Sequence, residues 1–458
     1  MTIPQGRLRR TAPLAGISAR AAGEGVVEVL RRRLRGERGA SLEFHVRNAE
    51  RYADVLSRSK GVLMKVGQIL SFVDITAAVD STYGAVYQAA LASLQSDAEP
   101  MDPVLVGAVL ESELGRGPEE LFAEFSPTPI AAASIGQVHV ARMHDGGEVA
   151  VKVQYPGVAE AICDDLANTE LLFTFVKIAK GVVPQFRNFD VRAIADEVSE
   201  RISEELDYAT ELANQSEFAE HYSGHPFVRV PEVFPELSSD RVLTMEMVHG
   251  RRWTDSADVD QALRDRWGEV VDRFFFGSIA RFGMFNADPH PGNYLFHDDG
   301  TVTFLDYGCV KRMTPAVQRG FWDQAAASLD NDAERLLRVF IEHGFARAES
   351  PPPADKLLAW HRQNFASLHL PQPFTFTPEF VAELLGQMAN MDKDVMRHVT
   401  VPKDFVFTNR IFIGLFSVLG ALRATSDWRA IFDECVTGQP TTELGRLEAD
   451  FFAAKNSA

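Results

Sequence analysis

The sequence predicts an α+β fold of two lobes, preceded by a separate helical unit. Residues 137–154 alternate apolar and polar positions around an Asp-Gly-Gly turn, as a β-hairpin does. Residues 294–305 contain a second hairpin pattern inside a half that otherwise has helical periodicity. The 458 residues are also too many for one ordinary hydrophobic core. We therefore expect a basic segment, a helical extension, a small mixed lobe and a mainly helical lobe over residues 1–40, 41–115, 116–250 and 251–458.

The first 40 residues are basic, in contrast to the rest of the chain. Nine arginines against three glutamates give this segment a charge of +6, and the whole chain carries −18, which leaves −24 for the remainder. A helix over 25–35 would end in Arg31-Arg-Arg-Leu-Arg35 and carry five apolar residues. Such a helix could contact an anionic membrane peripherally or dock on the acidic body. The acidic total charge argues against a nucleic-acid partner.

Cysteine usage and hydropathy favour a reducing compartment. Cys163, Cys309 and Cys435 are widely spaced and form no disulfide or metal-binding pattern. The N-terminus lacks the apolar segment of a secretory signal. The apolar run 411–422 has twelve residues, too few to span a bilayer as a helix, so it predicts a buried core helix. We expect a cytoplasmic protein that could contact a membrane at its surface.

The helical extension contains Lys65-Val-Gly-Gln68. Apolar residues between 52 and 70 recur mostly at helical spacings. Lys65 and Gln68 are three positions apart, so they share one helix face. On their own they are typical of a solvated surface helix.

Lys152 lies on the second strand of the first predicted hairpin, on the face opposite three alternating valines. A lysine that reaches the α- and β-phosphates of a nucleotide has this placement, and a helix carboxylate normally pairs with it. Glu211 is the expected partner. It belongs to an acidic helical stretch with Glu205 and Asp207, and Asp207 repels Glu211 across one turn. A solvated lysine and a solvent-facing acidic helix are the alternatives.

A run of small residues precedes this hairpin: Ala131, Ala132, Ala133 and Ser134, with Gly136 nearby. A phosphate-binding loop at this position normally contains several glycines, because glycine permits close backbone approach and positive φ. Alanines hinder the first and disfavour the second. We therefore expect a stiffer loop that holds a triphosphate differently, with a helix start as the alternative.

Residues 283–308 carry the most specific chemistry. Asp288 is followed five positions later by Asn293, and Asp306 stands in an Asp-Tyr-Gly sequence. The second predicted hairpin, with His297-Asp-Asp-Gly300 as its turn, would hold Asn293 and Asp306 near each other. Phosphoryl transfer needs one carboxylate that positions the acceptor, and an Asn and a second carboxylate that hold Mg²⁺ on the phosphates. Ordinary turn residues are the alternative.

Together these motifs resemble the UbiB/AarF family of atypical protein-kinase-like proteins. The resemblance covers about residues 50–310, and its motifs are Lys65-x-Gly-Gln68, the Ala131–Ser134 loop, Val151-Lys-Val-Gln-Tyr-Pro-Gly157, Glu205-x-Asp207, Asp288-Pro-His-Pro-Gly-Asn293 and Asp306-Tyr-Gly308. It implies a bilobal protein-kinase-like fold that binds ATP or ADP with Mg²⁺. The KxGQ extension would fold over the acceptor site and meet the ExD residues there. The family is associated with isoprenoid-quinone lipid metabolism and with ATPase or small-molecule kinase-like activity.

The resemblance also implies a role for each residue. Asp288, Lys152 and Glu211 are the expected catalytic residues, Asn293 and Asp306 the metal ligands, and Lys65, Gln68, Glu205 and Asp207 the regulatory residues. The expected nucleotide contacts are Ala131, Ala132, Ala133, Ser134, Lys152, Glu246 and Val248. Asn286 is a departure, because many relatives have a histidine two positions before the first aspartate. Such a histidine supports the loop by hydrogen bonds, and asparagine can also donate and accept them.

Three functions are compatible with this sequence. The first is an ATP-hydrolysing or phosphate-transferring enzyme that serves a quinone precursor or an isoprenoid lipid. The second is a pseudokinase, a nucleotide-gated module that binds lipid or protein; the alanine run favours it, and the intact set of Lys152, Asp288, Asn293 and Asp306 argues against it. The third is an antibiotic-type phosphotransferase, against which the Lys65–Gln68 motif and the alanine run count.

Overall fold

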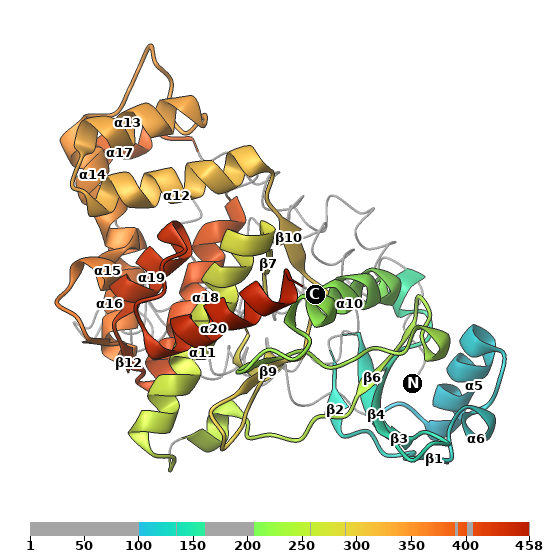
Figure 1. Cartoon of the computed structure of the whole chain (residues 1–458). Helices are drawn as coiled ribbons and strands as arrows, with labels where there is room; N and C mark the ends of the chain where they lie inside the picture. Colours follow the sequence, from blue (N-terminus) through green and yellow to red (C-terminus); the bar gives the residue numbers. More distant parts are fainter. Residues whose placement is uncertain are drawn as a thin grey trace, which may run out of the picture. The chain divides into compact units, whose positions relative to one another are not determined.

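The computed structural model describes residues 100–133, 135–160, 206–256, 258–288, 290–389, 393–400 and 406–457. Its elements fall into two compact units (Figure 1). Unit 1 comprises Met1–Ala213 and Val233–Met247, and unit 2 comprises Asn214–Glu232 and Val248–Ala458. The division falls inside helix α10 (Tyr208–Tyr222). Residues 214–232, which the sequence pattern assigned to the small lobe, pack with unit 2 because strand β5 (Val228–Arg229) pairs with strand β9 (Val302–Phe304).

Unit 1 is built on an antiparallel sheet with the strand order β1-β3-β4-β6, and β2 pairs with β3. The predicted hairpin is present as β3 and β4, with His139 opposite Val151. Val149, Val151 and Val153 are fully buried and share a core with Leu110 of helix α5. The bounds are α5 Pro103–Leu114, α6 Pro118–Leu121, β1 Glu124–Phe125, β2 Ala131–Ala132, β3 Gly136–Arg142, β4 Glu148–Gln154 and β6 Val242–Glu246.

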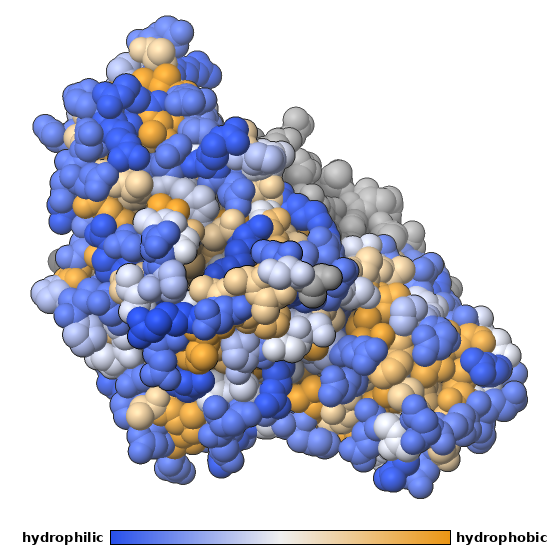
Figure 2. Space-filling view, in the orientation of Figure 1, coloured by the Kyte–Doolittle hydropathy of each residue, from blue (hydrophilic) through white to orange (hydrophobic). Residues whose placement is uncertain are grey.

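Helix α5 has well-defined ends. The side chain of Asp102 accepts a hydrogen bond from the N–H of Val104, and Gly115 closes the helix at φ 70°, where a residue without Cβ is favoured. Its first turn exposes two apolar side chains, since Val104 and Leu105 are 78% and 42% exposed. Figure 2 shows orange, apolar surface in this region, whereas hydrophilic residues cover most of the rest of that face.

Unit 2 is mainly helical and is organised around the long helix α11 (Gln261–Phe282). The predicted second hairpin is present as β8 and β9, in the register Tyr294↔Phe304. Phe274 of α11 stacks on Phe304 with ring centroids 3.7 Å apart, which fixes the hairpin to the helix. The remaining bounds are β7 Met284–Asn286, β8 Tyr294–Phe296, β10 Val310–Arg312, α12 Pro315–Leu329, α13 Ala333–Glu342, α14 Ala354–Asn364, α15 Ala366–His369, β11 Phe374–Thr375, α16 Pro378–Ala389, α17 Lys393–Met396, α18 Val406–Leu422, β12 Thr425–Ser426, α19 Trp428–Thr437 and α20 Glu443–Lys455.

The prediction of a buried helix over 411–422 is confirmed by α18. Leu415, Leu419 and Leu422 of this helix are at most 1% exposed. Among the described residues, no helix combines the length and the apolar character needed to cross a membrane.

Candidate functional site

The sheet of unit 1 places Lys152 against Glu211, as the sequence predicted. The Lys152 ammonium lies 2.9 and 2.8 Å from the two carboxylate oxygens of Glu211, and the two side chains are 14% and 3% exposed. The ammonium also lies 4.7 Å from the centre of the Tyr208 ring. Charge-assisted bonds to both oxygens and a cation–π contact hold the lysine in one position. The pair therefore fixes the Lys152 ammonium in a largely buried position on the polar face of β4.

Asp207 has a different local role. Its Oδ1 accepts the N–H groups of Ala209 (3.0 Å) and Thr210 (3.1 Å), so it caps the first turn of α10. Its other oxygen accepts the Thr210 hydroxyl at 2.6 Å. The other predicted regulatory residues, Lys65, Gln68 and Glu205, lie outside the described residues. The predicted contact between the KxGQ motif and the acidic helix therefore stays a prediction.

The alanine run forms a short strand. Ala131 pairs with Val138 and Ala132 with Gln137 on β3, and the N–H of Ala133 donates to the carbonyl of Gly136 at 2.9 Å. Ser134 lies outside the described residues. Ala131 and Ala132 are exposed, and their backbone is held by the ladder. Ala131 and Ala132 are therefore paired in a strand and do not start a helix, and the stiffness of the loop stays a prediction.

Gly136 is required by strand packing. A Cβ atom at this position would lie 2.3 Å from the carbonyl oxygen of Val153 on β4. The close approach of β3 to β4 therefore explains this glycine without any phosphate.

Glu246 and Val248, the other expected nucleotide contacts, flank the point where the chain passes from unit 1 to unit 2. Glu246 ends β6 opposite Val149 and is exposed, and Val248 is half-buried. The N–H of Met247 donates to the carbonyl of Glu148 at 3.0 Å, which keeps this short connection attached to the sheet edge.

In unit 2 the second hairpin brings the three polar site residues into one connected loop. The Nδ2 of Asn293 lies 3.3 Å from both the carbonyl oxygen and the Oδ2 of Asp288. The carbonyl of Asn293 accepts the N–H of Leu305 at 2.9 Å, so Asn293 and Asp306 lie at the same end of β8 and β9, as predicted. The Oδ1 of Asp306 accepts the N–H of Gly308 at 3.0 Å.

Asn286 connects Asp288 and Asp306 through its side chain. Its Oδ1 accepts the N–H of Asp288 at 2.9 Å, and its Nδ2 donates to the carbonyl oxygen of Asp306. The asparagine thus makes the supporting hydrogen bonds expected of a histidine at this position.

The side-chain oxygens of Asn293 and Asp306 are ligands that suit Mg²⁺. The Nδ2 of Asn293 donates to Asp288, which leaves its carbonyl oxygen as the acceptor that a hard cation prefers. Within the described ranges, no group of three or more His, Cys, Asp or Glu side chains is arranged to hold a metal ion. A Mg²⁺ bound by Asn293 and Asp306 would take its other ligands from phosphates and water, as is usual for this ion.

Asn214 is a supporting residue that the sequence analysis missed. Its side chain donates to the carbonyl of Tyr307 at 3.0 Å and accepts from Arg312 at 3.1 Å, so it fixes the Asp-Tyr-Gly segment to α10. The signal was a polar residue on the apolar side of a helix beside Phe218, whose ring lies 4.9 Å from that of Tyr307. Burial raises the pKa of Tyr307 well above its usual value.

Comparisons with known proteins agree with these motifs. Residues 93–340 match the ABC1 atypical kinase-like domain. An uncharacterised aarF domain-containing protein kinase of the Arabidopsis thaliana chloroplast is 34% identical over 272 residues, which are 59% of this chain and 37% of that protein. The mitochondrial atypical kinase COQ8B of Rattus norvegicus is 31% identical over 343 residues, 73% of this chain and 62% of the relative. The chain thus spans less than two thirds of these curated relatives.

A solved structure has a similar fold over nearly its whole length. The complex of Rv3197 with erythromycin from Mycobacterium tuberculosis superposes with a TM-score of 0.61 at 31% identity, and the match covers 84% of this chain and 94% of that one. The fold is therefore kinase-like, as the sequence predicted. On the match to more than half of its length and on this likeness, the chain belongs to the ABC1/UbiB family of atypical kinases.

Proposed function

We propose that the chain is a Mg²⁺-dependent enzyme that binds ATP or ADP and either hydrolyses ATP or transfers its phosphate to a small or lipid-linked acceptor. The observation that carries the proposal is the Lys152–Glu211 pair, whose side chains are only 14% and 3% exposed. Desolvating an ion pair costs energy that apolar packing would not, so the pair is poor evidence for a role in stability alone. A fixed lysine of this kind suits the phosphates of a nucleotide.

The loop of unit 2 supplies the remaining roles. We propose that Asp288 positions the acceptor and that Asn293 and Asp306 bind Mg²⁺. The bound Mg²⁺ would neutralise charge on the phosphates. Lys152, oriented by Glu211, holds the α- and β-phosphates. Ala131–Ser134, Glu246 and Val248 contact the nucleotide in this proposal.

The metal assignment is tested by Asp306→Asn. This variant should lose Mg²⁺-dependent ATP binding, measured as the thermal shift that ATP causes with and without Mg²⁺. Asp298→Asn is the matched control, since Asp298 lies in the turn of the same hairpin, 74% exposed and 2.7 Å from Arg251. An Asp306→Asn protein that keeps the wild-type Mg²⁺ dependence would overturn the assignment.

The family supports a proposal for the class of acceptor. We propose a quinone precursor or isoprenoid lipid, supported by the resemblance to the UbiB/AarF family and by the COQ8B relative. The basic residues 1–40, outside the described residues, would bring the protein to an anionic membrane surface. ATP turnover with and without liposomes and phenolic quinone precursors tests the acceptor. Flotation with anionic and neutral liposomes at low and high salt tests the membrane contact, and equal binding to both would exclude an electrostatic attraction.

A second candidate is a nucleotide-gated binding module. The strand-paired alanine run favours it, and the related Rv3197 was solved with erythromycin, a large ligand that is not a nucleotide. Such a module would bind Mg²⁺ and ATP without turnover. Thermal shift with erythromycin, with and without ATP, distinguishes the two candidates when it is combined with a turnover assay.

A further inference from the structure

Both ends of the Asn286 amide form hydrogen bonds to the acid loop, the segment of residues 286–308 that contains Asp288, Asn293 and Asp306. It is the last residue of β7 and is only 8% exposed. Its oxygen accepts the N–H of Asp288, and its nitrogen donates to the carbonyl of Asp306, twenty residues further along the chain. Both bonds go to backbone atoms, so they fix the backbone of Asp288 and of Asp306 without involving the carboxyl groups.

The backbone around this residue is held independently. Asn286 pairs with Val310 in the two-stranded sheet of β7 and β10, and the N–H of Ala287 donates to the carbonyl of Cys309 at 2.7 Å. Asp288 is therefore hydrogen-bonded to one asparagine before it in the chain, Asn286, and to one after it, Asn293. The side chain of Asn286 also bonds to Asp306, so it links the segment before Asp288 to the far end of the hairpin.

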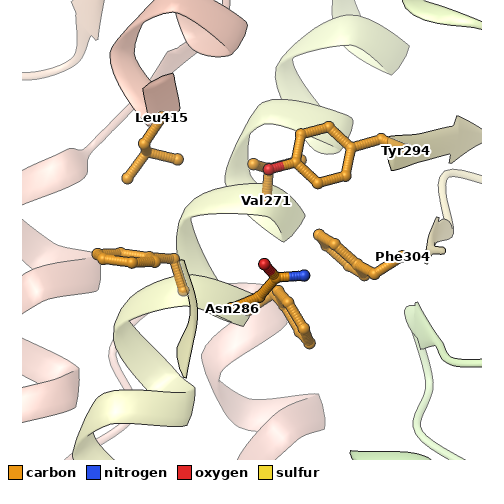
Figure 3. A pocket seen from close by; sticks show the side chains of 7 residues that line it. Val271, Asn286, Tyr294, Phe304 and Leu415 are labelled. Atoms are coloured by element: carbon orange, nitrogen blue, oxygen red, sulfur yellow. The ribbon is translucent and has the colours of Figure 1, made fainter. Parts of the chain in front are cut away.

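Position 286 has room beyond its asparagine. The Asn286 side chain points into a small cavity whose walls include Val271, Tyr294, Phe304 and Leu415 (Figure 3). The cavity offers about 10 Å³ to the centre of a water molecule, roughly the space of one water.

We propose that Asn286 is a positioning residue that sets the separation of Asp288 and Asp306. One amide group bonds both to Asp288, which we assign to the acceptor site, and to Asp306, which we assign to Mg²⁺. The inference rests on the proposed function for the roles of the two aspartates, but the linkage itself does not depend on nucleotide.

Two substitutions separate hydrogen bonding from packing. Asn286→Leu removes both bonds and keeps a side chain branched at the same atom, and Asn286→His restores a donor and an acceptor. Val271→Ala is the control, because it enlarges the same cavity without touching either bond. Asn286→Ala replaces the leucine variant if that variant does not fold.

Asn286→Leu should lower kcat for ATP turnover by roughly ten- to a hundredfold, with a smaller change in KM, because small misplacements of reacting groups have effects of this size. It should also accelerate hydrogen exchange in residues 284–308 without nucleotide. Asn286→His should recover most of kcat and most of the slow hydrogen exchange, and Val271→Ala should change neither quantity. A leucine variant with unchanged exchange, or an equal loss in Val271→Ala, overturns the inference. If the wild type turns over no ATP, the proposed enzyme function fails and hydrogen exchange alone decides the role of Asn286.

Discussion

Replacing Arg273 by methionine should destabilise unit 2 by about 3 kcal/mol. Arg273 lies in the middle of α11 and is 1% exposed. Its guanidinium lies 2.8 Å from Glu269 of the same helix, 2.8 Å from Glu434 of α19 and 3.4 Å from Glu448 of α20. It also donates to the Thr442 hydroxyl, which caps α20. One cation therefore joins three helices.

The magnitude follows from what the substitution would leave behind. The side chains of Glu434 and Glu448 are 6% and 3% exposed, so both would be buried carboxylates with fewer positive neighbours. Losing one partner of a buried ion pair costs about 3–5 kcal/mol. Arg281 lies 3.2 Å from Glu448 and would compensate in part, which places the expected loss at the lower end of this range. Burial raises the pKa of Glu448 although both arginines lower it, so losing Arg273 would raise it further.

The assay can report on unit 2 alone, because all five tryptophans of the chain, at 253, 267, 322, 360 and 428, lie in that unit. Urea unfolding followed by tryptophan fluorescence therefore avoids treating the two units as one transition. The matched control is Arg335→Met. Arg335 is also 2.8 Å from a carboxylate, that of Asp330, but the two side chains are 37% and 59% exposed. This surface pair should be worth less than about 1 kcal/mol. Equal losses in the two variants would refute the argument from burial.

Three further predictions concern other buried groups. Burial raises the pKa of Asp272 to about 8 despite the neighbouring Arg273; the folded protein then keeps a proton that the unfolded chain releases, so stability falls as pH rises from about 4 to about 8. Asp272→Asn should flatten this fall in urea midpoints measured at pH 5 and pH 8. The Tyr307 hydroxyl has no hydrogen-bond partner among the described residues, so Tyr307→Phe should raise thermal stability by about 1 kcal/mol. Gly136→Ala should cost about 1–3 kcal/mol by overpacking, seen as faster hydrogen exchange in β3 and β4.

Short-range patterns explain what the sequence predicted well. Both hairpins have a turn sequence between alternating runs, and a strand's period of two fixes which residues face the core. Lys152 could therefore be placed opposite the buried valines, and Asn293 and Asp306 at one end of a hairpin. The pairing of Lys152 with Glu211 is a longer-range prediction, 59 residues apart. It rested on the need of a nucleotide-binding lysine for a helix carboxylate and on the acidic stretch that contains Glu211.

The supporting contacts could not be predicted because their partners are distant in sequence and ambiguous in type. Asp207 was expected to repel Glu211, but it caps the helix while Glu211 faces Lys152, so the two carboxylates have separate partners. Asn286 could be recognised as a departure from its relatives. Its simultaneous bonds to Asp288 and Asp306 become visible only when β7 and the second hairpin are placed together.

Arg273 shows most clearly how burial alters the meaning of a local pattern. Glu269 and Arg273, four residues apart on one helix, have the spacing of an ordinary surface pair. Two further ion-pair partners of Arg273, Glu434 and Glu448, follow 161 and 175 positions later, on α19 and α20. Both lie beyond the residues 93–340 that match the family domain. Helix α11 carries Arg273 beside Phe274, whose ring stacks on Phe304 of the acid-loop hairpin. The helices outside the matched domain therefore stabilise the helix on which that hairpin rests. A stability defect in the Arg273 cluster should then also weaken the Mg²⁺-dependent nucleotide binding that we propose.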